Sequence, residues 1–254
     1  MRLIQEPYAP FLLLLGLFAL VTAAYSLTLP IMEGPDEPEH YGYVEAVRRS
    51  QDPASLAGHE RAQPPLYYLV AAVLVAPFNP PPWDGALVLN PWWAFNAPPT
   101  VPDNKNHFLH TPAEADLVPG VRAARLASLG FGMMAVLGTW LAGREMLPGH
   151  GALLAATLVA FTPQFIQTCA QVSNDSAAAG LSALALWRLL ILGRRGATRQ
   201  NALWAGLMLG LALLAKSSAL TLIPVALLAA WQGRRSDRSP WLILFGLAGL
   251  VGGW

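Results

Sequence analysis

Two short polar runs precede residue 70, and the first has side chains at a spacing that suits acid–base chemistry. The first run holds Asp36, Glu37 and His40. If a helix begins near Asp36, then Asp36 and His40 lie one turn apart on the same face, with Glu37 beside them. A carboxylate beside the positive end of a helix stays ionised and can accept a proton. A solvated helix start has the same pattern, so the run alone leaves a catalytic and a structural interpretation open.

The second run is Gln63-Pro64-Pro65-Leu66-Tyr67-Tyr68, which follows His59-Glu60. Its prolines predict a turn that leads into a helix. The two tyrosines either anchor that helix at a membrane surface or contact a substrate.

A third polar pair, Asn174 and Asp175, stands just before a long apolar run. An asparagine caps a helix well, and an acid in the first turn is favoured by the helix dipole. An acid at membrane depth is also costly and often functional. Both interpretations stay open for this pair.

Three cations stand at the ends of apolar runs, namely Lys216, Arg122 and Arg125. Each could lie along apolar surface with its charge in water, or could hold a phosphate at the level of the lipid headgroups. The two arginines run against the usual excess of Lys and Arg on the cytoplasmic side, which favours a functional interpretation.

His107 and His110 have a spacing that a helix could use to hold a metal, with Asp103, Asn104 and Asn106 as neighbouring oxygen ligands. Ordinary polar loop residues give the same pattern more often. We therefore assign no metal site to this segment and no cofactor to the protein, while a divalent metal stays open as an alternative.

The composition is that of an integral membrane protein. Charged residues make up 12% of the 254 residues and hydrophobic residues 54%, whereas soluble domains carry about 25% charged residues. The mean hydropathy is +0.42. The net charge of +1 excludes a globally basic nucleic-acid-binding protein. The single cysteine, Cys169, excludes an intramolecular disulfide.

Seven apolar segments are candidates for membrane spans, which need about 20 residues each. They are Pro10–Leu29, Ala123–Leu141, Ala152–Cys169, Ala177–Leu192, Leu203–Leu214, Ser218–Trp231 and Trp241–Trp254. The fifth and sixth could be two short spans or a helical hairpin that turns near one interface. The first exceeds the roughly 7–15 residues of a signal-peptide core, so we expect it to be retained. The chain ends inside an apolar run, which predicts an N-terminal fragment of a longer protein. The predicted fold is all-α, a multi-pass transmembrane bundle.

Alternating spans place the Arg-rich short loops on one side, which predicts a cytoplasmic N-terminus in the cell membrane. Residues 30–121 then form a long extracytoplasmic loop within a single membrane-embedded domain of residues 1–254. This loop holds 11 of the 15 acidic residues, so polar chemistry gathers at one membrane face. Within it, Asp36–Ser50 should be helical, and Leu66–Phe78 should be an interfacial helix too short to span.

Four of these features resemble the membrane glycosyltransferases with the GT-C fold, which use polyprenyl-phosphate-linked sugars. The matching runs are Pro35-Asp36-Glu37-Pro38-Glu39-His40-Tyr41, Gln63-Pro64-Pro65-Leu66-Tyr67-Tyr68, Asn174-Asp175 and Gly210-Leu211-Ala212-Leu213-Leu214-Ala215-Lys216. The segment Asp103–His110 also looks like theirs. Relatives include the protein O-mannosyltransferases and the lipid A aminoarabinose transferase. The likeness covers nearly the whole chain.

The resemblance implies a role for each matched residue. Asp36 would be the catalytic base, with Glu37 adjacent, and Asp175 would orient the acceptor or assist the base. Lys216 and either Arg122 or Arg125 would hold the donor phosphate. Substrate contacts would come from His40, Gln63, Tyr67, Tyr68 and Asn174. The reaction would be one inverting displacement, from a polyprenyl-phosphate sugar in the lipid to the hydroxyl of an unknown acceptor, without nucleic acid.

Two other functional classes stay open. A transporter or lipid flippase would fit the proline interruptions at Thr162-Pro163 and Ile223-Pro224, but it would more often place ionisable groups at mid-membrane. A non-catalytic assembly subunit would use the long loop as a docking surface. The clustering of polar groups at one interface favours the enzyme.

Overall fold

The computed structural model describes residues 8–56, 58–91, 93, 106–232 and 239–253. In the first part of the chain lie α1 (Tyr8–Thr28), α2 (Glu37–Arg48), η1 (Pro53–Ser55), η2 (Glu60–Ala62), α3 (Leu66–Val75), η3 (Ala76–Phe78), α4 (Trp83–Ala86), β1 (Val88–Leu89), β2 (Phe108–Leu109) and η4 (Pro112–Glu114). The remaining helices are α5 (Val118–Met146), α6 (Gly151–Ala160), α7 (Pro163–Ala170), α8 (Asn174–Arg195), α9 (Arg199–Ala215), η5 (Ser217–Leu222), α10 (Ile223–Gln232) and α11 (Ser239–Gly252).

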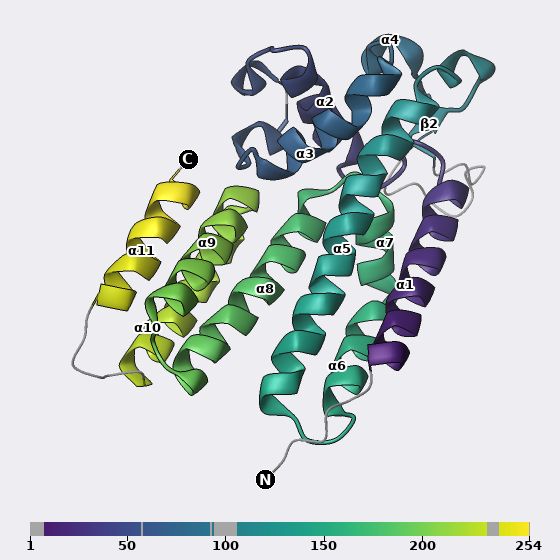
Figure 1. Cartoon of the computed structure of the whole chain (residues 1–254). Coiled ribbons are helices and arrows are strands. Elements are labelled where there is room, and N and C mark those ends of the chain that lie inside the picture. Colours follow the sequence, from purple (N-terminus) through teal and green to yellow (C-terminus); the bar gives the residue numbers. More distant parts are fainter. Residues whose placement is uncertain (1–7, 57, 92, 94–105, 233–238, 254) are drawn as a thin grey trace.

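The long apolar helices stand side by side, and α2, α3 and α4 form a layer over one end of them (Figure 1). The described residues contain one two-stranded antiparallel sheet, β1 with β2. The predicted all-α bundle is therefore confirmed. We call the end of the bundle that this layer covers the loop end.

The centre of the bundle is the packing of α5 on α8, which depends on two glycines. A Cβ at Gly138 of α5 would lie 2.8 Å from the Ala183 backbone of α8, and a Cβ at Gly180 of α8 would clash with the carbonyl oxygen of Phe131. Small residues let helix backbones approach closely in membrane bundles, where apolar burial alone gives little driving force.

Fewer helices are long enough to cross a membrane than the seven spans predicted. Among the described residues, α1, α5 and α8 are long and apolar enough, and α6 with α7 adds a fourth if that pair, bent by 60°, is one span. The bend occurs because Pro163 begins α7 and cannot continue the hydrogen bonds of α6. The helices α9, α10 and α11 have 17, 10 and 14 residues, short of the roughly 20 that a span needs.

The loop layer contains both helices that the sequence predicts there. α2 has acids in its first turn and Arg48 in its last, which suits the helix dipole. α3 buries Tyr67 and Tyr68 completely, while Leu69 and Val73 are 47% and 72% exposed. A short helix with one face on the bundle and an apolar face outward is typical of an interfacial position.

A buried ion pair between Arg125 and Glu37 joins the layer to the bundle. Arg125 Nε donates to Glu37 Oε1 at 2.8 Å, and Nη2 donates to Oε2 at 2.8 Å. The other N–H groups of Arg125 donate to the carbonyl oxygens of Ser26, Leu29 and Pro30 at 2.7–2.9 Å. A guanidinium has five N–H groups, so all five are used.

Glu37 is equally committed to the structure. Its Oε1 also accepts the backbone N–H of Val172 at 2.8 Å, and its Oε2 accepts that of Gly34 at 3.3 Å. Its side chain is fully buried, and that of Arg125 is 1% exposed. We call this arrangement the Arg125–Glu37 clamp. It ties the end of α1, the start of α2, α5 and the residues before α8 to one point.

Replacing Arg125 with alanine should destabilise the protein strongly. Removing one partner leaves the Glu37 carboxylate buried without its cation, which typically costs about 3–5 kcal/mol. We expect the melting temperature of the purified protein in detergent to fall well below that of wild type. The control is Arg194→Ala, which removes an exposed arginine and should change the melting temperature little. Equal melting temperatures for the two variants would show that the clamp does not hold the fold.

Candidate active site

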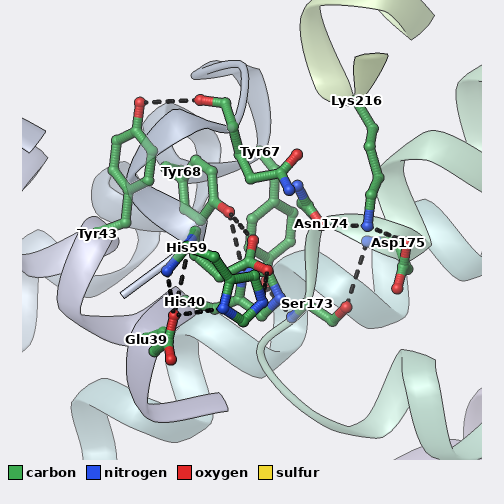
Figure 2. Close-up of polar contacts among 12 residues, drawn as sticks. Glu39, His40, Tyr43, His59, Tyr67, Tyr68, Ser173, Asn174, Asp175 and Lys216 are labelled. Atoms are coloured by element: carbon green, nitrogen blue, oxygen red, sulfur yellow. Dashed lines mark hydrogen bonds and ion pairs between the residues drawn. The ribbon is translucent and has the colours of Figure 1, made fainter. Parts of the chain in front are cut away.

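Residues from α2, η2, α3, the start of α8 and the end of α9 meet in one polar cluster at the loop end (Figure 2). Its loop half contains Asp36, Glu39, His40, His59, Glu60 and Tyr68. Its bundle half contains Asn174, Asp175 and Lys216.

Asp36 precedes α2 but does not cap it. Its side chain accepts no hydrogen bond from the first turn, although its backbone carbonyl accepts the N–H of His40 at 3.0 Å. Its φ is 57°, in the left-handed region, which is uncommon for a residue with a Cβ and carries a cost. The side chain is exposed and has no hydrogen-bond or ion-pair partner within the described ranges. This carboxylate is therefore accessible from solvent.

His40 lies beneath Asp36, one helical turn further along α2. Its Nδ1 is 2.9 Å from the hydroxyl of Tyr68 and 3.4 Å from Glu60 Oε2. Burial, helped by the charge of Lys216, lowers the pKa of His40 from 6.5 to about 4. The imidazole is therefore neutral near pH 7. Burial raises the pKa of Glu60.

His59 joins two carboxylates that the sequence alone did not assign to the site. Its Nδ1 is 3.3 Å from Glu39 Oε2, and its Nε2 is 3.0 Å from Glu60 Oε1. Asp36, His59 and Glu60 each offer a ligand atom, and these atoms lie within 4.8 Å of one another. Such nitrogen and oxygen donors could hold a divalent cation. The dipeptide His59-Glu60 was visible in the sequence, but its contact with a helix some twenty residues earlier was not.

In the bundle half, Lys216 ends α9 and reaches the first turn of α8. Its Nζ donates to Asp175 Oδ1 at 2.7 Å and is 3.4 Å from Asn174 Oδ1. Ser173 caps α8 by accepting the N–H of Asp175 at 3.2 Å, so the Asp175 carboxylate is not needed as a cap. The Asp175 and Lys216 side chains are 57% and 22% exposed. Asn174 is fully buried.

The two halves are close enough to act on each other electrostatically. The charges of Lys216 and Asp175 both shift the pKa of His40, and those of Lys216 and Asp36 both act on Glu60. The predicted meeting of Asp36, His40, Asn174, Asp175 and Lys216 at one end of the bundle is thus what the structure contains.

Other residues expected to contact substrate have structural partners instead. Glu37 and Arg125 are used up in the clamp, so Arg125 has no N–H left for a phosphate. The buried hydroxyl of Tyr67 lies 2.7 Å from Ser128 Oγ and accepts the N–H of Ser173 at 3.0 Å, which positions the start of α8. Tyr68 is buried, and its hydroxyl contacts His40 Nδ1 and Glu60 Oε2.

Gln63 and Arg122 stand apart from these contacts. The carbonyl oxygen of Gln63 accepts the hydroxyl of Tyr43 at 3.2 Å, while its side chain is half-buried. Arg122 is exposed and lines a different cavity, on the α1 side of α5. Since α-helical residues are spaced about 100° apart, Arg122 points about 120° away from Ser128, which faces Tyr67.

The histidines of the 107–110 segment serve the loop structure. His110 is 2.9 Å from both Glu33 and Glu114, and the ring of His107 stacks on Trp93 at 4.7 Å. These contacts fit the interpretation of polar loop residues. Asp103 and Asn104 lie outside the described residues.

The shifted pKa of His40 predicts that stability depends on pH. The pKa of His40 in the folded protein lies below the 6.5 of an unfolded histidine, so the unfolded chain takes up the extra proton first on acidification. The contribution of His40 is complete above pH 6.5 and is lost as the pH falls toward 4. The expected loss is on the order of 3 kcal/mol. Melting temperatures between pH 8 and pH 4.5 should fall more steeply for wild type than for His40→Gln, and parallel curves would contradict the assignment.

Comparison with known proteins gives one match. The family model described as dolichyl-phosphate-mannose-protein mannosyltransferase matches residues 119–252, from the start of α5 to the end of α11 and over half of the chain. Searches of curated proteins and of solved structures found no match. The matched range contains Asn174, Asp175 and Lys216, whereas Asp36 precedes it. The chain belongs to the dolichyl-phosphate-mannose-protein mannosyltransferase family, and it is a membrane glycosyltransferase of the mannosyltransferase type.

Proposed function

We propose that the protein transfers a sugar from a polyprenyl-phosphate carrier to an acceptor hydroxyl, with inversion, and that Asp36 is the general base. The observation that carries this proposal is that one cluster contains both an exposed carboxylate without a partner among the described residues, Asp36, and a partly exposed ammonium group, Lys216. The first can take a proton from a nucleophile, and the second can stabilise a phosphate that leaves. The family description supports mannose as the sugar and a protein as the acceptor.

Asp36 has the properties of a base rather than of a structural acid. Its neighbours Glu37 and Glu39 are occupied, by the clamp and by His59. Its own carboxylate is exposed and has no hydrogen-bond or ion-pair partner among the described side chains. The strained backbone at Asp36 fits this role, because such strain persists where the surrounding structure enforces it and is frequent at active sites.

The ion pair that Lys216 forms in the structure is weak. Its ion pair with Asp175 is partly exposed, and pairs of this kind contribute only about 0–1 kcal/mol. A phosphate can therefore replace Asp175 at the ammonium at little cost. When the phosphate replaces Asp175 at Lys216, the Asp175 carboxylate becomes available to accept a hydrogen bond from the acceptor molecule. Asp36 removes the proton of the attacking hydroxyl of the same molecule.

The chemical step is a single displacement. The acceptor oxygen attacks the anomeric carbon while its proton passes to Asp36. The bond between that carbon and the phosphate oxygen breaks, and its electron pair leaves with the polyprenyl phosphate, whose negative charge Lys216 stabilises. His40 is neutral, so it can offer an N–H or a lone pair without adding charge. No step in this scheme requires a metal.

The membrane geometry supports a donor that stays in the lipid. The cluster lies where the spans α5 and α8 meet the loop layer, beside the interfacial helix α3 (Figure 1). A polyprenyl chain can remain among the apolar helices while its phosphate reaches Lys216. We propose that this end of the bundle faces the extracytoplasmic side, because the excess of arginines in the short loops marks the opposite side as cytoplasmic.

Replacing Asp36 with asparagine should abolish most of the transfer. The change keeps the size of the side chain but removes its basicity, and general-base catalysis contributes about 10²–10⁴-fold to a rate. The measurement is transfer from radiolabelled polyprenyl-phosphate mannose in membranes that contain the full-length protein. The matched control is Asp84→Asn, an exposed loop aspartate in α4, which should transfer like wild type. Equal rates for Asp36→Asn and wild type, at equal protein level, would remove Asp36 from the mechanism.

Removal of the Lys216 charge should affect the donor rather than the fold. We expect Lys216→Gln to lower kcat/KM for the donor by about 10²–10³-fold, the typical cost of losing one group that stabilises developing charge. Its melting temperature should change little because the ion pair is partly exposed. Lys216→Arg keeps the charge and should retain more activity than Lys216→Gln. Wild-type kcat/KM in Lys216→Gln would show that the phosphate binds elsewhere.

A further inference from the structure

A groove of about 450 Å³ runs between α1 and α5 on the side of α5 away from the candidate active site. Its walls are mostly apolar and include Leu27 of α1, Leu126 and Leu129 of α5, and Phe78 of η3. Leu27, Leu126 and Phe78 are 60%, 59% and 54% exposed. Because α1 and α5 are both long enough to span a membrane, the groove opens toward lipid chains.

One cation stands at the loop end of this groove. Arg122 lies in the second turn of α5, is exposed, and has no hydrogen-bond or ion-pair partner in the described part of the chain. Glu37, the acid that contacts the neighbouring Arg125, is already committed to that residue. Among the described residues, the positive charge of Arg122 therefore has no counter-charge in contact with it.

A second polar group lies deeper in the same groove. Thr22 of α1 lines it, is fully buried, and its Oγ1 has no partner among the described residues. Other threonines of the long helices satisfy their hydroxyls on the carbonyl oxygen four residues earlier, as Thr139, Thr157 and Thr168 do at 2.8–2.9 Å. The hydroxyl of Thr22 thus has no hydrogen-bond partner in the described part of the chain, which is uncommon for a buried polar group.

We propose that this groove binds one anionic glycerophospholipid of the leaflet at the loop end. The phosphate pairs with Arg122, an ester carbonyl accepts the hydroxyl of Thr22, and one acyl chain lies along Leu126 and Leu129. Along the groove, a cation at the surface is followed by a hydroxyl and then by leucines. A glycerophospholipid has the matching order of a phosphate, ester groups and acyl chains. An anionic headgroup is specified because it supplies the missing counter-charge for Arg122.

The bound lipid has a structural consequence. Arg125 lines the base of the groove beside Ser26, so the lipid covers the Arg125–Glu37 clamp on its membrane side. It excludes water from the five hydrogen bonds of the guanidinium and fills the seam between α1 and α5. The site is separate from that of the sugar donor and does not depend on the proposed reaction.

The test is lipid retention by the full-length protein in detergent, measured by native mass spectrometry with added phosphatidylglycerol or phosphatidylcholine. Wild type should retain one phosphatidylglycerol in preference to phosphatidylcholine. Arg122→Gln should weaken this retention at least tenfold, and Thr22→Val, which is isosteric and lacks the hydroxyl, should weaken it severalfold. Arg194→Gln, which removes an exposed arginine outside the groove, should retain the lipid like wild type. Circular dichroism of each variant shows that the helices are intact.

Three results would overturn the proposal. Equal retention by wild type, Arg122→Gln and Thr22→Val would show that the groove does not hold the lipid. Displacement of the lipid by a polyprenyl phosphate at lower concentration than by phosphatidylglycerol would assign the groove to the donor. A second protein copy bound in place of lipid, detected as a dimer that Arg122→Gln abolishes, would make the groove a protein interface.

Discussion

The Arg125–Glu37 clamp is the interaction on which the site depends. A charged pair with no exposed surface is weak evidence for stability, because desolvation offsets most of the Coulomb attraction. In this protein the pair fixes the positions of the chain segments that it joins. One guanidinium uses all five N–H groups to join the end of α1, the loop that follows it and the first residue of α2. The partner carboxylate adds the backbone of Val172.

Both halves of the active site are attached directly to this clamp. Asp36 immediately precedes Glu37, so burial of Glu37 fixes where the exposed Asp36 carboxylate must stand. Asp175 follows Val172 by three residues, and Val172 donates to the same Glu37 oxygen. The two acids are far apart in the sequence, yet each lies within three residues of a group that belongs to the clamp, Glu37 or Val172. The clamp thus brings a loop residue and a residue in the first turn of α8 to one site, as the proposed reaction requires.

Local patterns predicted the helices and the end at which chemistry gathers. Apolar runs predicted α1, α5 and α8, and the acids near Asp36 predicted the start of α2. The broken helix at Pro163 was the part of the span pattern that hydropathy missed, since hydropathy does not register a lost backbone donor. The apolar blocks left open whether segments 203–214 and 218–231 each cross a membrane, and the structure gives α9 and α10 only 17 and 10 residues.

Roles that depend on tertiary contact could not be predicted from spacing. Arg125 and Arg122 look alike in the sequence, as cations at the start of the same apolar run. Arg125 is buried in contact with Glu37, whereas Arg122 is exposed and has no such partner among the described residues. In the same way, Tyr67 became a support for α8 only through Ser128 and Ser173. Burial decides between a binding role and a structural role, and burial is a property of the whole fold.

The most direct test of the proposed reaction is a structure of the full-length protein in a lipid nanodisc, bound to a non-hydrolysable phosphonate analogue of a polyprenyl-phosphate sugar. We predict that the phosphonate lies within hydrogen-bonding distance of Lys216 Nζ, with Asp175 released and the anomeric carbon facing the Asp36 carboxylate. A phosphonate bound at the opposite end of the bundle, or on Arg122 with Lys216 still paired to Asp175, would contradict the assignment of this site.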